Sequence, residues 1–248
     1  MSGLRLLAID TSTEACSAAL LWSDGDIKLR FTLTERGHAE LILPMIDQLL
    51  AEAGCRLGDL DGLAFGRGPG GFTGLRIAAG VAQGLAFGAG LRVAPVSSLA
   101  AVAWQVTTLT SPASAGEVAR DAGEGILVVN DARMHEFYWA CYRFEASADC
   151  TPVLLTPEQV GPAANIMPPP SVRRCAGNGL ARDPSLHARL TAAGLCVHPG
   201  IYPRADAVAR LGQQVFLAGG ALAPADALPV YVRDDVVKAV QPAVTGMS

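Results

Sequence analysis

The sequence is poor in charge and has no basic cluster. Only 17% of its residues are charged, its formal net charge is −4, and its single adjacent basic pair is Arg173-Arg174. Proteins that hold RNA or DNA by themselves neutralise its phosphates with clustered lysine and arginine side chains. Any nucleic-acid substrate would therefore have to be held by another chain.

Local metal-binding and hydrolase motifs are also missing. Ile42 stands four residues after His38, and Trp139 stands where a second ligand would follow His135-Glu136. The sequence contains neither C-x-x-C nor G-x-S-x-G. These absences argue against a zinc or iron enzyme and against the common hydrolase elbow.

Signals for secretion or membrane insertion are absent as well. The six cysteines lack the spacing of a small disulfide scaffold and are expected to be free thiols in a reducing compartment. Asp10 interrupts the first apolar run too early for a signal peptide, and the uncharged stretch 93–116 contains Pro95 and Gln105. We expect a cytoplasmic protein without a membrane span.

The sequence contains enough hydrophobic residues to form the cores of two lobes. Half of its 248 residues are hydrophobic, and the length exceeds the usual ~100–200 residues of one domain. Apolar runs and turn residues predict an order of three meandering strands, helix, strand, helix, strand, helix. The expected ranges are 4–9, 16–22, 27–33, 38–53, 62–65, 73–89, 91–96 and 97–104. This order is typical of the ribonuclease H-like lobe of actin-like ATPases.

A second unit is expected to repeat the first. Ser, Thr, Pro, Ala and Gly crowd between residues 107 and 125, which indicates the boundary between lobes. After it, Ile126–Val129 runs into Asn130-Asp131, as Leu6–Ile9 runs into Asp10-Thr11. We predict lobes at 1–110 and 111–248, a last helix that can return to lobe one, and a loose tail at 234–248. Further elements are expected near 135–144, 153–155, 184–193 and 205–218.

A glycine-rich loop, Gly66 to Gly74, precedes the second helix. It fits G-x-G-x-x-G, but no acidic residue follows between 77 and 116 to bind a ribose. It fails as a P-loop because Phe72 replaces the phosphate-binding lysine. Two interpretations stay open: a tight strand-to-helix turn, or an anion site at a helix N-terminus.

Two aspartates end the first strand of each predicted lobe. Asp10 and Asp131 stand where actin-like phosphotransferases place contacts to metal-bound phosphate. An aspartate that ends a strand is, however, more often a turn former. A self-sufficient ATP-dependent phosphotransferase is therefore the alternative function to be tested.

The helix predicted from Thr73 carries Gly80, Gly84 and Gly88 at i+4 spacing. Each glycine costs about 1 kcal/mol relative to alanine in a helix interior, so close packing is expected to offset the loss. The neighbour could be the sheet of the same lobe, the helix at 38–53, or a partner chain.

Four passages together resemble the TsaB family, which takes part in adding threonylcarbamoyl to the adenosine beside the tRNA anticodon. They are Leu7-Ala8-Ile9-Asp10-Thr11-Ser12-Thr13, residues 68–76 (GPGGFTGLR), residues 131–138 (DARMHEFY) and Pro229-Val230-Tyr231-Val232-Arg233. They span nearly the whole chain in the family's order. Gly71 departs from the pattern, because the family usually has serine there.

The resemblance implies a degenerate actin-like fold of two ribonuclease H-like lobes that has lost catalysis. It implies a heterodimer with a TsaD-like catalytic subunit, joined by a TsaE-like ATPase, with ATP/ADP and metal on those partners and no cofactor of its own. The tRNA would be contacted only indirectly, and the chain alone could form a homodimer.

The same resemblance suggests which residues to test. The expected partner interface comprises His38, Leu41, Ile42, Met45, Leu49, Ile77, Gly80, Gly84 and Gly88. The expected nucleotide or anion contacts are Asp10, Thr11, Gly68, Gly70, Gly71, Thr73, Arg76, Asp131 and Arg133.

Overall fold

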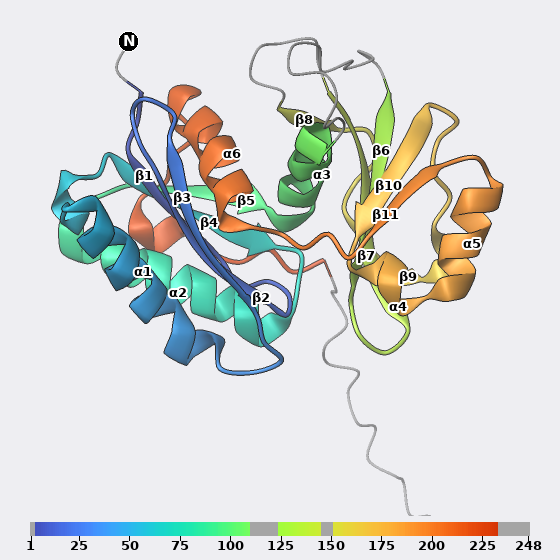
Figure 1. Ribbon diagram of the computed structural model, residues 1–248, viewed down its shortest axis with the longest axis horizontal. Coiled ribbons are helices and arrows are strands. Elements are labelled where there is room, and N and C mark those ends of the chain that lie inside the picture. The colour runs from blue at the N-terminus through green and yellow to red at the C-terminus, as the bar shows by residue number, and fades with distance from the viewer. Residues whose placement is uncertain (1–2, 110–123, 145–150, 233–248) are drawn as a thin grey trace, which may run out of the picture.

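The structure, a computed structural model, describes residues 3–109, 124–144 and 151–232. These residues form two mixed β-sheets, each covered by helices on both faces (Figure 1). The predicted boundary at 110/111 and the predicted tail at 234–248 lie outside the described residues.

The first sheet has the order β3-β2-β1-β4-β5. Its strands are β1 (Leu6–Asp10), β2 (Ala15–Leu21), β3 (Ile27–Leu33), β4 (Gly62–Gly68) and β5 (Val93–Ser97). The first three form an antiparallel meander, whereas β4 and β5 run parallel to β1. The three opening strands were predicted within two residues at their ends.

The second sheet repeats this order. Its strands are β6 (Gly125–Asp131), β7 (Glu136–Phe144), β8 (Pro152–Leu154), β9 (Gln159–Pro162), β10 (Val172–Gly177) and β11 (Cys196–Pro199). Read from the β8 edge, the order is β8-β7-β6-β10-β11, with β9 also paired to β7 and with β10 and β11 parallel to β6. Two ribonuclease H-like lobes in tandem make the actin-like architecture, so the predicted fold class is confirmed.

Each sheet has helices packed on both of its faces. In the first sheet α1 (His38–Ala53) and α2 (Phe72–Ala89) cover one face and α6 (Ala205–Leu217) the other (Figure 1). In the second, α4 (Gly179–Arg182) and α5 (Pro184–Ala192) lie on one side and α3 (Ser98–Leu109) on the other. Short 3-10 turns occupy Leu57–Asp59, Ala163–Asn165 and Pro224–Asp226.

The two lobes exchange their last helices. Helix α3 follows β5 of the first sheet but packs Leu99, Val102 and Val106 against strands of the second. Helix α6 follows β11 of the second sheet but packs Val208 and Leu211 against the first. Each lobe is therefore completed by a segment from the other half of the chain.

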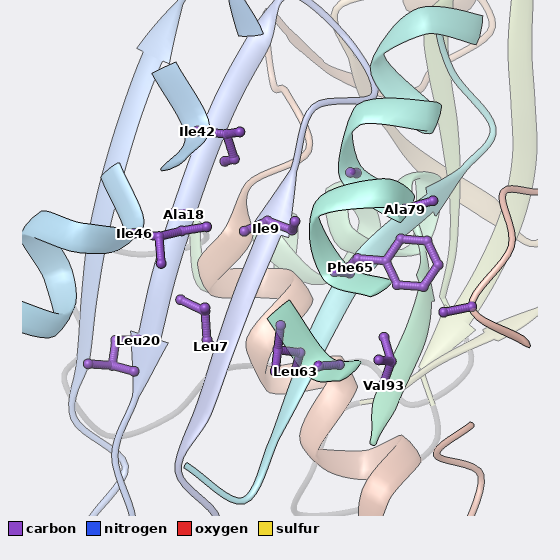
Figure 2. Packing of buried hydrophobic residues seen from close by; sticks show 14 of the residues in the cluster. Leu7, Ile9, Ala18, Leu20, Ile42, Ile46, Leu63, Phe65, Ala79 and Val93 are labelled. Atoms are coloured by element: carbon purple, nitrogen blue, oxygen red, sulfur yellow. The ribbon is translucent and has the colours of Figure 1, made fainter. Parts of the chain in front are cut away.

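The core of the first lobe lies between its sheet and helices α1 and α2. Leu7, Ile9, Leu63 and Phe65 point from the sheet toward these helices (Figure 2). All four are fully buried, and such burial contributes roughly 1.5–3 kcal/mol for each large side chain. This packing fixes which face of α1 and of α2 is turned outward.

Three strands and one short helix were not predicted: β9, β10, β11 and α4. Strand β10 reads Val-Arg-Arg-Cys-Ala-Gly and β11 Cys-Val-His-Pro, so neither has a run of β-branched or aromatic residues. Tertiary pairing makes them strands, because β10 pairs with β6 and β11 pairs with β10. Within the described ranges, no helix combines the length and apolarity needed to cross a bilayer.

Candidate partner surface and inter-lobe cavity

The glycine face of α2 is open. A Cβ atom added at Gly80, Gly84 or Gly88 would meet no atom of the described residues within 4 Å, and all three glycines are exposed. The opposite face of the helix is buried and consists of Leu75, Ala78, Ala79, Ala82 and Ala86. These glycines therefore pack neither against the sheet of their own lobe nor against α1.

Two residues assigned to the partner surface lie in the core instead. Ile42 and Leu49 have no exposed surface, and Ile42 points toward the sheet beside Ile9 and Ala18 (Figure 2). Their assignment was wrong because the apolar stripe that predicts a helix marks the face turned to its own sheet.

The remaining assigned residues are half-buried. Leu41, Met45 and Ile77 pack against the core at its edge. His38 begins α1, and its Nε2 lies 2.8 Å from the carbonyl oxygen of Thr13. These four can contribute only part of their surface to a partner.

Two exposed apolar side chains on α1 and α2 were missed. Phe87 on α2 is 83% exposed, and Leu43 on α1 is 46% exposed. The signal for Phe87 was present, since it follows Gly84 by three residues and lies off the buried alanine face.

The glycine-rich loop packs tightly against the β1–β2 turn. A Cβ at Gly70 would lie 2.4 Å from the Ser12 carbonyl oxygen, and one at Gly74 would lie 1.9 Å from that of Thr11. The Gly71 N–H donates to Ser12 O at 2.7 Å, and Thr11 Oγ1 donates to Gly74 O at 2.7 Å. These contacts favour the tight-turn interpretation, because they alone explain why glycine is needed.

Asp10 is enclosed. Its Oδ1 accepts hydrogen bonds from the N–H and Oγ of Ser12, its Oδ2 accepts one from Ser98 Oγ, and no part of it is exposed. Burial raises the pKa of this carboxyl, although the hydrogen bonds counter the effect. Asp10 does not line the cavity described below, so its assignment as a nucleotide contact is not supported by its placement.

The lobe-two counterpart of Asp10 is Asn130, not Asp131. Asp10 follows Leu6 and Ala8 on the α6 face of β1, and Asn130 follows Ile126 and Val128 on the α3 face of β6. A one-residue shift along a strand moves a side chain to the opposite face. Asp10 and Asp131 therefore do not converge on one metal, and the described residues contain no group of three metal-ligating side chains.

A cavity of about 660 Å³ lies between the lobes. It is bordered by the β1–β2 turn, the start of α1, the loop before α2, the β6–β7 turn and residues 230–232. Of the predicted nucleotide or anion contacts, it brings together Thr11, Gly70, Gly71, Thr73, Asp131 and Arg133.

Gly68 and Arg76 are not part of the cavity lining. Arg76 instead stacks 4.0 Å above the Phe72 ring and donates through Nε to the Tyr231 hydroxyl at 3.1 Å. The rings of Phe72 and Tyr231 pack with centroids 5.4 Å apart. Arg76 thus ties residues near the C-terminal end of the described chain to α2.

The β6–β7 turn that borders the cavity is strained. Arg133, Met134 and His135 have φ angles of 65°, 53° and 60°, a conformation that non-glycine residues rarely adopt. Asp131 holds the turn in place, since its Oδ1 accepts from the Arg133 N–H at 2.9 Å and its own N–H donates to Asn178 Oδ1 at 3.0 Å.

Comparison with known proteins decides the family. A family model described as TsaD, tRNA N6-adenosine threonylcarbamoyltransferase, matches residues 32–195. The Escherichia coli protein named tRNA threonylcarbamoyladenosine biosynthesis protein TsaB is 37% identical over 239 residues, covering 94% of this chain and 96% of that protein. The chain belongs to the TsaB family.

Further TsaB relatives agree. The Haemophilus influenzae protein of the same name is 48% identical over 140 residues, or 56% of this chain and 54% of that protein. A solved structure titled YeaZ from Pseudomonas aeruginosa superposes with a TM-score of 0.78 at 35% identity, covering 93% of this chain and all of that one.

The departure from the TsaB family pattern at Gly71 is structurally mild. Gly71 has a φ of −64°, which any residue can adopt, and an added Cβ would lie 3.7 Å from Ser12 O, an ordinary contact. The usual serine of the TsaB family would therefore fit here without rearrangement.

Proposed function

We propose that this chain is a non-catalytic subunit that binds a TsaD-like catalytic subunit and holds it in its active form. Membership of the TsaB family indicates involvement in tRNA threonylcarbamoyladenosine biosynthesis. The observation that supports binding to a TsaD-like subunit is the open glycine face of α2 at Gly80, Gly84 and Gly88. Glycines that cost stability and pack against no other part of the described chain fit a surface kept bare for another backbone.

The placement of the two aspartates supports a role without catalysis. Asp10 is saturated with hydrogen bonds and enclosed, and Asp131 belongs to the opposite face of its strand. The phosphotransferase alternative needs both carboxylates on one magnesium ion. We therefore assign nucleotide and metal chemistry to the partner subunits.

The rest of the proposed assembly follows from the same resemblance. A TsaE-like ATPase joins the pair in the cytoplasm, and the partners hold the tRNA, because this chain has a net charge of −4. Without a partner, two copies would cover their α2 faces against each other as a homodimer.

Substitution of Gly84 tests the proposal. Gly84→Leu places a bulky side chain where a partner backbone must approach, so the affinity for the TsaD-like subunit should fall by more than 100-fold, about 3 kcal/mol or more. The fold should be preserved because the added atoms meet open space. The affinity is measured by calorimetry with both purified subunits.

Two variants make the result specific. Ala188→Leu adds a similar side chain at an exposed position of α5 in the other lobe and should leave the affinity unchanged. Gly84→Ala should stabilise the isolated chain by up to about 1 kcal/mol while weakening the complex. Undiminished affinity of Gly84→Leu, or reconstituted tRNA modification that needs no TsaB-family chain, would refute the proposal.

A further inference from the structure

The inter-lobe cavity is continuous with the proposed partner surface. His38 and Ile77 belong to both: they stand on α1 and α2 among the interface residues, and they line the cavity. A protein that covers the outer faces of these helices therefore reaches the mouth of the cavity without a gap.

The mouth of the cavity is apolar and exposed. Phe72, Tyr231 and Met134 are 49%, 41% and 82% exposed, and all three line it. Exposed large apolar side chains gathered around a hollow mark interaction sites more often than solvated surface. The cavity's volume of about 660 Å³ lies within the range of cavities that hold a ligand.

The charge of the lining disfavours a phosphate-bearing ligand. Four carboxylates line the cavity, against two guanidinium groups and one histidine: Glu14, Glu35, Glu40 and Asp131, against Arg36, Arg133 and His38. Arg133 stands two residues after Asp131, and Arg182 pairs with two of the four carboxylates, with Nη2 2.6 Å from Glu14 Oε1 and Nε 3.9 Å from Asp131 Oδ2. With Arg182 counted, four carboxylates face three guanidinium groups, and the exposed carboxylates are those of Glu35 and Glu40. An excess of carboxylates repels an anion and attracts a cation.

The strained turn gives the rim a defined shape. The Met134 side chain is exposed to solvent, and the Met134 backbone adopts the left-handed conformation. Such strain persists only where the surroundings enforce it, and it concentrates at functional positions. Here Asp131 and the hydrogen bond from the Ala132 N–H to Glu136 O enforce it.

We propose that the inter-lobe cavity is a socket for a segment of the same partner that covers α2, a segment with apolar side chains and a lysine or arginine. The inference rests on the proposed function, since it assigns this segment to the TsaD-like subunit. Met134, Phe72 and Tyr231 form the apolar part of the socket lining, and the exposed carboxylates of Glu35 and Glu40 receive the cation.

The test uses Met134→Asn in the full-length chain with the purified TsaD-like subunit. Asparagine tolerates the left-handed region, so relief of strain should raise the Tm of the isolated chain by about 2–4 °C. Loss of the apolar wall should nevertheless weaken the complex about tenfold in Kd. Met167→Asn, at a position 77% exposed and outside the cavity, is the matched control and should leave Kd unchanged.

The outcomes separate this inference from the proposed function. If Gly84→Leu abolishes the complex while Met134→Asn leaves Kd unchanged, the socket is refuted and the partner surface stands. A Kd unaffected by Glu35→Lys would overturn the cationic part of the assignment. Calorimetric binding of Mg-ATP or ADP to the isolated chain that Met134→Asn weakens would identify the cavity as a nucleotide site and overturn the proposal.

Discussion

Glu14 Oε1 accepts a hydrogen bond from Arg182 Nη2 at 2.6 Å, which joins the β1–β2 turn of the first lobe to α4 of the second. Glu14 Oε2 also accepts from Asn178 Nδ2 at 3.0 Å. The Glu14 side chain is only 11% exposed, whereas that of Arg182 is 53% exposed. The carboxylate is thus the buried centre of a contact between lobes.

The contact predicts a pH dependence of stability. Burial by itself would raise the pKa of Glu14, but the hydrogen bond and charge of Arg182 lower it below its ordinary 4.5. A lowered folded-state pKa contributes stability that is present above about pH 4.5 and lost as the pH falls through the folded-state value. We expect Glu14→Gln to lose about 1 kcal/mol at pH 7, because Arg182 is half exposed, and a smaller amount at pH 3.

Urea unfolding at both pH values checks this. Glu52→Gln removes the more exposed pair with Arg30 and should change stability by less than about 0.5 kcal/mol. An equal loss for Glu14→Gln at pH 7 and pH 3 would show that the effect is not electrostatic.

Asp10 is expected to behave in the opposite sense. Burial raises its pKa, so the ionised carboxylate opposes folding, and stability declines as the pH rises through the folded-state pKa. In Asp10→Asn, the side-chain oxygen can accept from Ser12 and the amide can donate to Ser98 Oγ. This variant should be at least as stable as the parent chain at pH 7, with the difference vanishing at low pH. It should also support tRNA modification fully, whereas a magnesium ligand could not be replaced in this way.

Gly71→Ser should stabilise the chain. Gly71 is the N-cap of α2 and has no side chain to bond the free N–H groups of the first turn. Serine restores such a cap and restricts the unfolded chain, which together contribute about 0.5–1 kcal/mol. Thermal and urea unfolding measure the gain.

Gly74→Ala is the contrasting change in the same loop. Its Cβ would overlap the Thr11 carbonyl oxygen, a backbone atom, and would displace the Thr11 hydroxyl bond. A loss of roughly 3 kcal/mol is expected. A neutral Gly74→Ala would mean that the β1–β2 turn yields more easily than its packing indicates.

The cysteines should differ sharply in reactivity. Burial raises the pKa of Cys16 to about 11 and that of Cys175 to about 12, and it raises the pKa of Cys141 as well. At pH 8 a thiol of pKa 11 is only about 0.1% thiolate, whereas Cys196 is exposed on β11. Of these four cysteines, Cys196 should be the first modified by iodoacetamide, as followed by peptide mass spectrometry. Comparable labelling of Cys16 in the native chain would contradict the buried placement.

The order of elements was accessible from the sequence because it depends on local patterns. Apolar runs joined by Ser23-Asp24-Gly25-Asp26 predicted the opening meander, and the apolar spacing of 38–53 predicted α1 to its last residue. Pro44 did not end that helix. It lies exposed on the outer face of α1, where water can bond the carbonyl that loses its N–H partner. The absence of catalytic motifs was equally local, because each motif needs its residues at fixed spacing.

Only the tertiary structure shows which side chains face the core, the cavity or the solvent. Strand β6 is buried on both faces from Gly125 to Asn130 and half-buried at Asp131, so no apolar–polar alternation in the sequence indicates that Asn130, rather than Asp131, corresponds to Asp10. The periodicity of apolar residues placed Ile42 and Gly84 on helices, but it could not show which face of each helix packs against the sheet of its own lobe. Burial of Asp10, exposure of the glycine face, exchange of α3 and α6, and the cavity all arise from contacts between residues far apart in the chain. Such contacts leave no local pattern, because each side chain's environment is set by the segment that packs against it.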